Sequence, residues 1–176
     1  MTGGNAARRF EYQIQRGIMQ IFIAIIGGRN AGKSTIIKSL TGCPSGQYRG
    51  SVQDLVTKKS IEVIGSSPQE QAMSRADLRT ILKRAAGNAL CNGIVCALQP
   101  KKTRTRLSME DVLQEALAYG FKVHAYVLDP DRSGSHSPPT VLTQLKTAQA
   151  KVRTLDARRF AQINAATINK HTKIAS

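Results

Sequence analysis

Short apolar runs alternate with amphipathic segments along most of the chain. Every position of Ile21–Ile26 is apolar and most are β-branched, which is typical of a strand buried on both faces of a parallel sheet. Ile36 and Leu40 then recur at helical spacing, and Gly42 and Pro44 end that pattern. The chain therefore predicts a buried strand followed closely by a short helix.

The alternation of strand and helix patterns continues to residue 128. Two helices are predicted where a serine precedes an aspartate by three residues, a variant of the capping box, at Ser74 and Ser108. The remaining predicted elements are extended segments at 51–57 and 60–64 with a hairpin-like turn between them, a strand at 93–98 and a strand at 121–128. This order favours a three-layer α/β/α fold with a mostly parallel sheet.

The pattern changes beyond residue 131. Residues 132–139 are small and polar and end in two prolines, which predicts a flexible loop. From 140 to about 169, apolar residues recur at steps of three and four, which predicts a basic C-terminal helical segment. That segment either packs on the sheet as one or two helices or projects as an arm. The expected organisation is an N-terminal extension (1–17), an α/β domain (18–131), the loop (132–139) and the helical segment (140–176).

A glycine-rich segment lies between the first predicted strand and its helix. Its residues, Gly27-Gly28-Arg29-Asn30-Ala31-Gly32-Lys33-Ser34-Thr35, fit the pattern G-x-x-x-x-G-K-[ST]. Glycines allow the backbone to wrap around a phosphate with its N–H groups pointing inward, and the helix start adds partial positive charge. The segment resembles the Walker A motif of the P-loop NTPase superfamily, with the loop after the first strand as that family requires.

The resemblance implies that residues 27–35 bind a nucleoside triphosphate with Mg²⁺. It assigns Lys33 to the β- and γ-phosphates as a catalytic residue and the Ser34 hydroxyl to the metal. Phosphoryl transfer also needs a carboxylate at a strand end, yet none follows the predicted strand at 60–64. Asp129 directly follows the strand at 121–128 and is the candidate second metal residue. The alternative for Asp129 is a turn initiator before Pro130.

Residues 63–70 resemble the second switch of small GTPases. Gln69 and Glu70 match the Gln-Glu pair, so Gln69 is a candidate catalytic residue. Gly65 stands where the metal-organising Asp is expected, and Pro68 stands where the Gly is expected. No Asn-Lys-x-Asp follows a later strand. These differences argue against a regulatory GTPase, so ATP is the default nucleotide, while GTP is not excluded.

P-loop kinases offer a second resemblance, because they share the strand–helix alternation and often lack an orthodox carboxylate at that strand end. They use arginines on a lid to neutralise phosphates. Candidates for that role are Arg75, Arg79, Arg104, Arg106 and Arg132.

The formal net charge of +15 favours polyanionic partners. Candidate contacts to nucleic acid or to substrate phosphates are Lys101, Lys102, Arg104, Arg106, Arg158 and Arg159. The plainer alternative is a solvated basic face. Aromatic residues make up only 5% of the chain and Trp is absent, so base stacking is poorly supported.

Three function classes follow from these patterns. The first is an ATPase that acts on or with nucleic acid. The second is a kinase whose acceptor is a phosphorylated small molecule or a nucleic-acid end. The third is a small GTP-binding switch or a nucleotide-binding module with little turnover. Three cysteines without metal-ligand spacing and no long apolar segment predict a cytoplasmic protein with no membrane partner, and a homo-oligomer stays open.

Overall fold

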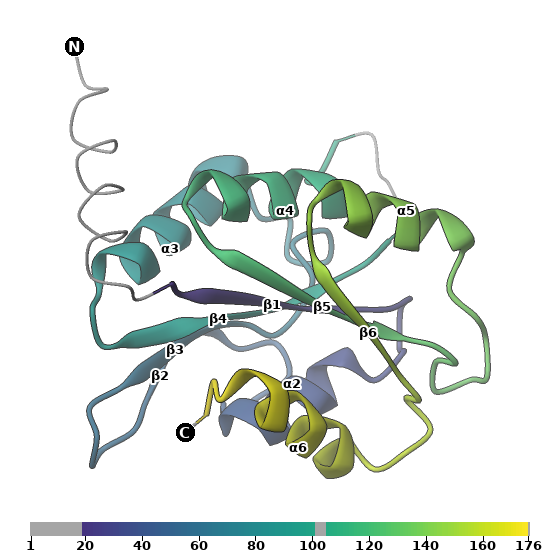
Figure 1. Ribbon diagram of the computed structural model, residues 1–176, viewed down its shortest axis with the longest axis horizontal. Coiled ribbons are helices and arrows are strands. Elements are labelled where there is room, and N and C mark those ends of the chain that lie inside the picture. The colour runs from purple at the N-terminus through teal and green to yellow at the C-terminus, as the bar shows by residue number, and fades with distance from the viewer. Residues whose placement is uncertain (1–18, 101–104, 176) are drawn as a thin grey trace.

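A computed structural model describes residues 19–100 and 105–175 of the chain. The three-layer α/β/α fold predicted from the sequence is confirmed, with the sheet between two layers of helices (Figure 1). The elements in chain order are β1 (Ile21–Ile26), α2 (Lys33–Thr41), β2 (Arg49–Gln53), β3 (Ser60–Ile64), α3 (Arg75–Gly87), β4 (Cys91–Leu98), α4 (Met109–Ala118), β5 (Lys122–Leu128), α5 (Pro139–Thr147), β6 (Lys151–Leu155) and α6 (Ala161–Thr172).

The six described strands form one sheet in the order β2-β3-β4-β1-β5-β6. The pair β2 and β3 is antiparallel, which confirms the predicted hairpin, and all other neighbours are parallel. The chain leaves β1 for the far edge at β2, returns through β3 and β4, and then passes β1 to reach β5 and β6. The direction of winding thus reverses at β1, and ligands of such sheets bind beyond the carboxyl ends of the strands at that point.

Two hydrophobic clusters cover the two faces of the sheet. Phe22, Ala24 and Ile26 of β1 belong to the cluster with α3, α4 and α5. Ile23 and Ile25 belong to the cluster with α2 and α6. Since neighbouring side chains of a strand point to opposite faces, β1 is buried from both sides, as its unbroken apolar sequence predicts. Figure 1 shows the two helix layers on either side of this strand.

The predicted helix starts and stops are confirmed at three helices. Ser74 and Asp77 form a full capping box at α3, and Ser108 and Asp111 form another at α4. Gly42 ends α2 in the left-handed conformation with a φ of 71°, and its N–H donates to the carbonyl of residue 38.

The C-terminal segment differs from its prediction. Residues 140–176 are not helical throughout, because strand β6 separates α5 from α6. Gln149 adopts a φ of 51° directly after α5, a left-handed turn that the sequence does not mark with glycine. Strand β6 pairs in parallel with β5, so the sheet is not complete at Leu128.

No helix in the part of the chain that the structure describes could span a bilayer. The longest, α3, has 13 residues, whereas a span needs roughly 20 apolar ones.

Helix α6 is expected to contribute strongly to stability through Ile168, which is fully buried against the sheet. We predict that Ile168→Ala lowers the free energy of unfolding by about 2–5 kcal/mol, because it leaves a cavity. Ile163→Ala on the same helix is the control, since that side chain is 48% exposed and its loss should cost less than about 1 kcal/mol. Urea denaturation followed by circular dichroism measures both, and equal losses would contradict the packing described here.

Candidate functional site

The glycine loop, residues 27–35, turns sharply between β1 and α2. Asn30 and Gly32 have φ values of 61° and 96°, so two residues of the loop are left-handed. A Cβ atom on Gly27 would lie 2.9 Å from the Cβ of Ala31, so only glycine fits there. Gly32 caps α2 without a side-chain hydrogen bond, so no side chain occupies the amides of the first turn. Such uncapped amides suit an anion.

Lys33 is folded beneath this loop. Its Nζ donates to the carbonyl oxygens of Gly27 at 3.0 Å and Gly28 at 2.5 Å, and the residue is only 5% exposed. Burial lowers the pKa of the ammonium, whereas the negative charge of Glu70 acts to raise that pKa. Two of the three N–H donors are used by these bonds, so one is left for a further acceptor.

Ser34 is covered by the loop that precedes β2. Its hydroxyl donates to the carbonyl oxygen of Gly65 at 2.9 Å. A Cβ on Gly46 would lie 2.9 Å from the Ser34 Cβ, and a Cβ on Gly65 would lie 2.6 Å from the Gly46 carbonyl oxygen. Three backbone segments therefore meet at Ser34, and two glycines permit the approach.

Hydrogen bonds hold residues 45–48 against the segment after β3. The N–H of Gly65 donates to the carbonyl of Tyr48 at 2.8 Å. The Ser66 hydroxyl donates to the carbonyl of residue 46 at 3.4 Å, and Gln71 Nε2 donates to the carbonyl of residue 47 at 3.2 Å. The loop after α2 is thus part of the site.

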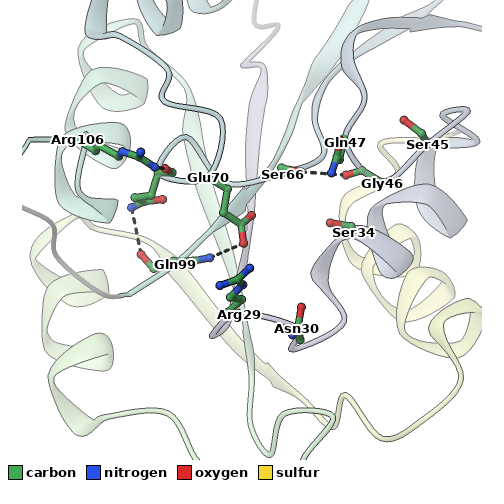
Figure 2. A pocket seen from close by; sticks show the side chains of 11 residues that line it. Arg29, Asn30, Ser34, Ser45, Gly46, Gln47, Ser66, Glu70, Gln99 and Arg106 are labelled. Atoms are coloured by element: carbon green, nitrogen blue, oxygen red, sulfur yellow. Dashed lines mark hydrogen bonds between the residues drawn. The ribbon is translucent and has the colours of Figure 1, made fainter.

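A cavity of about 750 Å³ opens above Ser34 at the carboxyl edge of the sheet (Figure 2). Its wall comes from the glycine loop, the loop before β2, the segment after β3 and the segment after β4. The lining residues are Arg29, Asn30, Ser34, Ser45, Gly46, Gln47, Ser66, Gln69, Glu70, Gln99 and Arg106.

Glu70 is the one acidic residue among these lining residues. Its carboxylate accepts a hydrogen bond from Gln99 Nε2 at 2.6 Å and another from the Ser67 N–H at 3.2 Å. Figure 2 shows the side chains of Arg29 and Glu70 pointing toward one another. The carboxylate is thereby fixed in the cavity, close enough to Lys33 to influence its pKa.

Gln69 lines the cavity, but its side chain is buried against the segment after β4. Its Nε2 donates to the Gln99 carbonyl at 3.3 Å, and the residue is buried. Its Oε1 has no hydrogen-bond partner among the described residues. Arg106 donates to the Gln69 carbonyl oxygen, which ties the segment before α4 to the segment after β3. The side-chain amide of Gln69 therefore links the segment after β3 to the segment after β4. The catalytic role of Gln69 stays a prediction.

Asp129 is not among the residues that line the cavity, and its role at a metal stays a prediction. Its carboxylate pairs instead with Nδ1 of His136, in the loop between β5 and α5. The described residues also contain no group of three or more His, Cys, Asp or Glu that could hold a metal ion. A cation here would have to rely on oxygen ligands around Ser34.

The other basic candidates have different surroundings. Lys101, Lys102 and Arg104 lie outside the described residues. Arg158 pairs locally with Asp156, and no ion pair involves the exposed Arg159 in the described part of the chain. Two lid candidates, Arg75 and Arg79, pair with Glu115 of α4 and so lie away from the cavity. Arg132 lies beside the glycine loop, with its Nε 3.9 Å from where a Cβ on Gly32 would be.

The sequence predicts part of the cavity wall. Ser66 and Gln99 closely follow predicted strands, and parallel strands end at a common edge, so their loops are expected to face the nucleotide; both residues line the cavity. Glu70 enters the sequence argument only as half of a Gln-Glu pair, and Gly46 and Gln47 have no role assigned from the sequence.

No protein-family model matches this chain, and no curated protein matches it in sequence. Among solved structures, it is similar to the FeoB G-domain from Methanococcus jannaschii. That similarity covers 88% of this chain and 99% of the other at 20% identity, with a TM-score of 0.45.

Gly65 is the position at which the site is most sensitive to a single added carbon. We predict that Gly65→Ala displaces residues 45–48, because its Cβ would lie 2.6 Å from a backbone oxygen. Hydrogen exchange should then accelerate at the amides of residues 45–48, and the free energy of unfolding should fall by about 1–3 kcal/mol. Gly87→Ala, where no atom lies within 4 Å, is the control and should leave both unchanged or improve stability. Unaltered exchange in Gly65→Ala would contradict the close approach.

Proposed function

We propose that this chain is a Mg²⁺-dependent nucleoside triphosphatase that binds ATP in the cavity above the glycine loop and works with nucleic acid. The observation that carries the proposal is the position of Lys33. Its ammonium bonds to the glycine loop at the carboxyl end of the central strand, and its chain neighbour Ser34 lines a cavity large enough for a nucleotide.

Three kinds of group in the loop would contact the phosphates: backbone amides, an ammonium and a guanidinium. The uncapped amides at the start of α2 would donate to phosphate oxygens, and the remaining N–H of Lys33 would do the same. Both groups are partly desolvated, so their attraction for a phosphate exceeds that of the same groups in water. Arg29 adds a guanidinium at the cavity wall.

The surroundings of Ser34 fit a magnesium ion. The hydroxyl hydrogen is donated to Gly65, so the oxygen lone pairs stay available as a ligand. Mg²⁺ in such sites keeps several waters and takes the rest of its ligands from substrate phosphates and one or two protein oxygens, so a carboxylate cluster is not needed. When bound, the ion would neutralise phosphate charge that develops during transfer.

Glu70 is the residue we assign to the attacking water. Its carboxylate is held in place by hydrogen bonds from Gln99 and the Ser67 N–H. A fixed carboxylate in the cavity can accept a hydrogen bond from a water molecule and orient it toward the terminal phosphate.

A second candidate function is phosphotransfer to an acceptor. It is favoured by the two arginines in the cavity wall, Arg29 and Arg106, because guanidinium groups bind phosphates in a bidentate geometry. The fate of the labelled γ-phosphate distinguishes the two functions. Hydrolysis releases it as inorganic phosphate, faster with DNA or RNA present, whereas a kinase transfers it to an acceptor.

We predict that Lys33→Ala weakens binding of a fluorescent ATP analogue by about 10- to 100-fold, since it removes charge-assisted hydrogen bonds to phosphate. Lys38→Ala, an exposed position on the same helix, should bind the analogue like the parent chain. Competition with unlabelled ATP and GTP identifies the preferred base. Equal affinity of Lys33→Ala and the parent chain would refute the proposed site.

We also predict that Glu70→Gln reduces phosphate release by about 10²- to 10⁴-fold with nucleotide affinity nearly unchanged. The amide keeps the size of the side chain but cannot accept hydrogen bonds as a carboxylate does. Glu110→Gln, on the exposed surface of α4, is the matched control. If Glu70→Gln turns over ATP at the parent rate, the assignment of Glu70 is wrong while the phosphate-binding assignment stands.

A further inference from the structure

Four basic side chains share one face of the strands β5 and β6. In the register of this parallel pair, His124 lies beside Lys151 and Tyr126 lies beside Arg153. Side chains two residues apart on a strand point to the same face, so Lys122 lies on the same face of β5 as His124. Tyr126 belongs to the hydrophobic cluster under α2 and α6, which identifies the face as the α6 side. We call the set Lys122, His124, Lys151 and Arg153 the β5–β6 basic face.

No acidic residue neutralises this face from the elements that form it. The sequences of β5, β6 and α6 contain neither Asp nor Glu. Within the described residues, none of the four basic side chains takes part in an ion pair. The last turn of α6 adds Lys170 and His171 rather than a counter-charge.

The positive charges on this face repel one another. Lys122 lowers the pKa of Lys151, first as a competing hydrogen-bond donor and then through its charge. Burial lowers the pKa of His124, and the charges of Lys151, Lys122 and Arg153 lower it further. Like charges on neighbouring strands destabilise a sheet, so the arrangement does not serve the stability of the fold.

Protection of an edge strand explains only part of the arrangement. Charged residues on an edge prevent unwanted pairing with other chains, and β6 is an edge strand. That argument applies to Lys151 and Arg153. It does not apply to Lys122 and His124, which lie on β5, one strand inside the edge.

We propose that the β5–β6 basic face binds the phosphate backbone of a nucleic acid. The charges of Lys151 and Arg153, two residues apart on β6, lie next to that of Lys122 on β5, and such a cluster matches the closely spaced phosphates along a nucleic-acid strand. The proposal names a contact surface for the nucleic-acid partner of the proposed function and rests on that function, although the surface is separate from the residues that line the nucleotide cavity.

The composition of the face favours nucleic acid over a membrane or a protein. Membrane surfaces and protein interfaces both call for exposed apolar or aromatic side chains among the charges. The large apolar side chains exposed in the described residues all lie outside β5 and β6, and Tyr126 is buried. Since β5 and β6 carry no exposed ring to stack on bases, binding through these two strands should be independent of base sequence and strongly dependent on salt.

The test compares two doubly charge-reversed variants of the full chain. Lys151→Glu with Arg153→Glu alters the basic face. Lys83→Glu with Lys146→Glu makes the same change in net charge on α3 and α5, on the opposite side of the sheet. Fluorescence anisotropy with labelled single-stranded DNA, RNA and duplex DNA, measured over a range of salt concentrations, gives affinity and salt slope.

We expect the basic-face variant to lose about tenfold or more in affinity and the control variant much less. The slope of log K against log salt should become shallower by about 1.4 on single strands or about 1.8 on duplex DNA, for two lost phosphate contacts. A milder variant, Lys122→Gln, should also bind more weakly yet melt at a higher temperature, because it relieves repulsion. A purely structural role for the face would not produce that combination.

Four results would overturn the proposal. These are equal losses in the two double variants, unchanged affinity in the basic-face variant, no measurable binding of any nucleic acid by the parent chain, or binding only to vesicles of anionic phospholipid. The nucleotide site and the basic face can be tested separately. The basic-face variant should bind the fluorescent ATP analogue like the parent chain, and Lys33→Ala should bind nucleic acid like the parent chain.

Discussion

The burial of β1 on all sides is the constraint on which the rest of the site depends. Hydrogen bonds to β4 and β5 occupy both edges of this strand, and hydrophobic clusters cover both faces. Its carboxyl end is therefore the place where the strand can meet a ligand. There the N–H of Gly27 extends the ladder by donating to Leu98, and the close approach of Ala31 forces a tight turn. A rigid strand thus holds the glycine loop, and a rigid loop holds Lys33.

The local patterns predicted the elements of the α/β domain well because each pattern has one physical interpretation. An unbroken apolar run such as that of β1 fits a strand covered on both faces, and a serine three residues before an aspartate fits a helix start. The C-terminal segment was harder. Val141, Leu145 and Val152 fit a helical spacing, but the helix ends at a left-handed glutamine that no glycine or proline announces. Pairing of β6 with β5 then decides the conformation, and pairing is a tertiary effect.

The motif predicted the part of the site that is contiguous in sequence, and the strand ends predicted that the loops after β3 and β4 face it, but no pattern predicted which side chains meet there. Residues 27–35 carry their own geometry, whereas Glu70, Gln99 and Arg106 meet only because β3, β4 and α4 end or begin at the same edge. The surroundings of Asp129 could not be predicted for the same reason. A sequence identifies an acid at a strand end, but it does not reveal that the following loop returns His136 to that carboxylate.

Net charge becomes informative only when the structure shows which positive charges pair with acidic residues and which do not. The buried carboxylate of Glu62 pairs with Arg84, and Glu115 pairs with two arginines of α3, so these cations stabilise carboxylates that would otherwise be buried without a partner. Such pairs account for basic residues without any external partner. Lys151 of β6 differs, because the neighbours that lower its pKa are other cations, first Lys122 and then Arg153. Repulsion that a single substitution would relieve points to a ligand that supplies the missing negative charge.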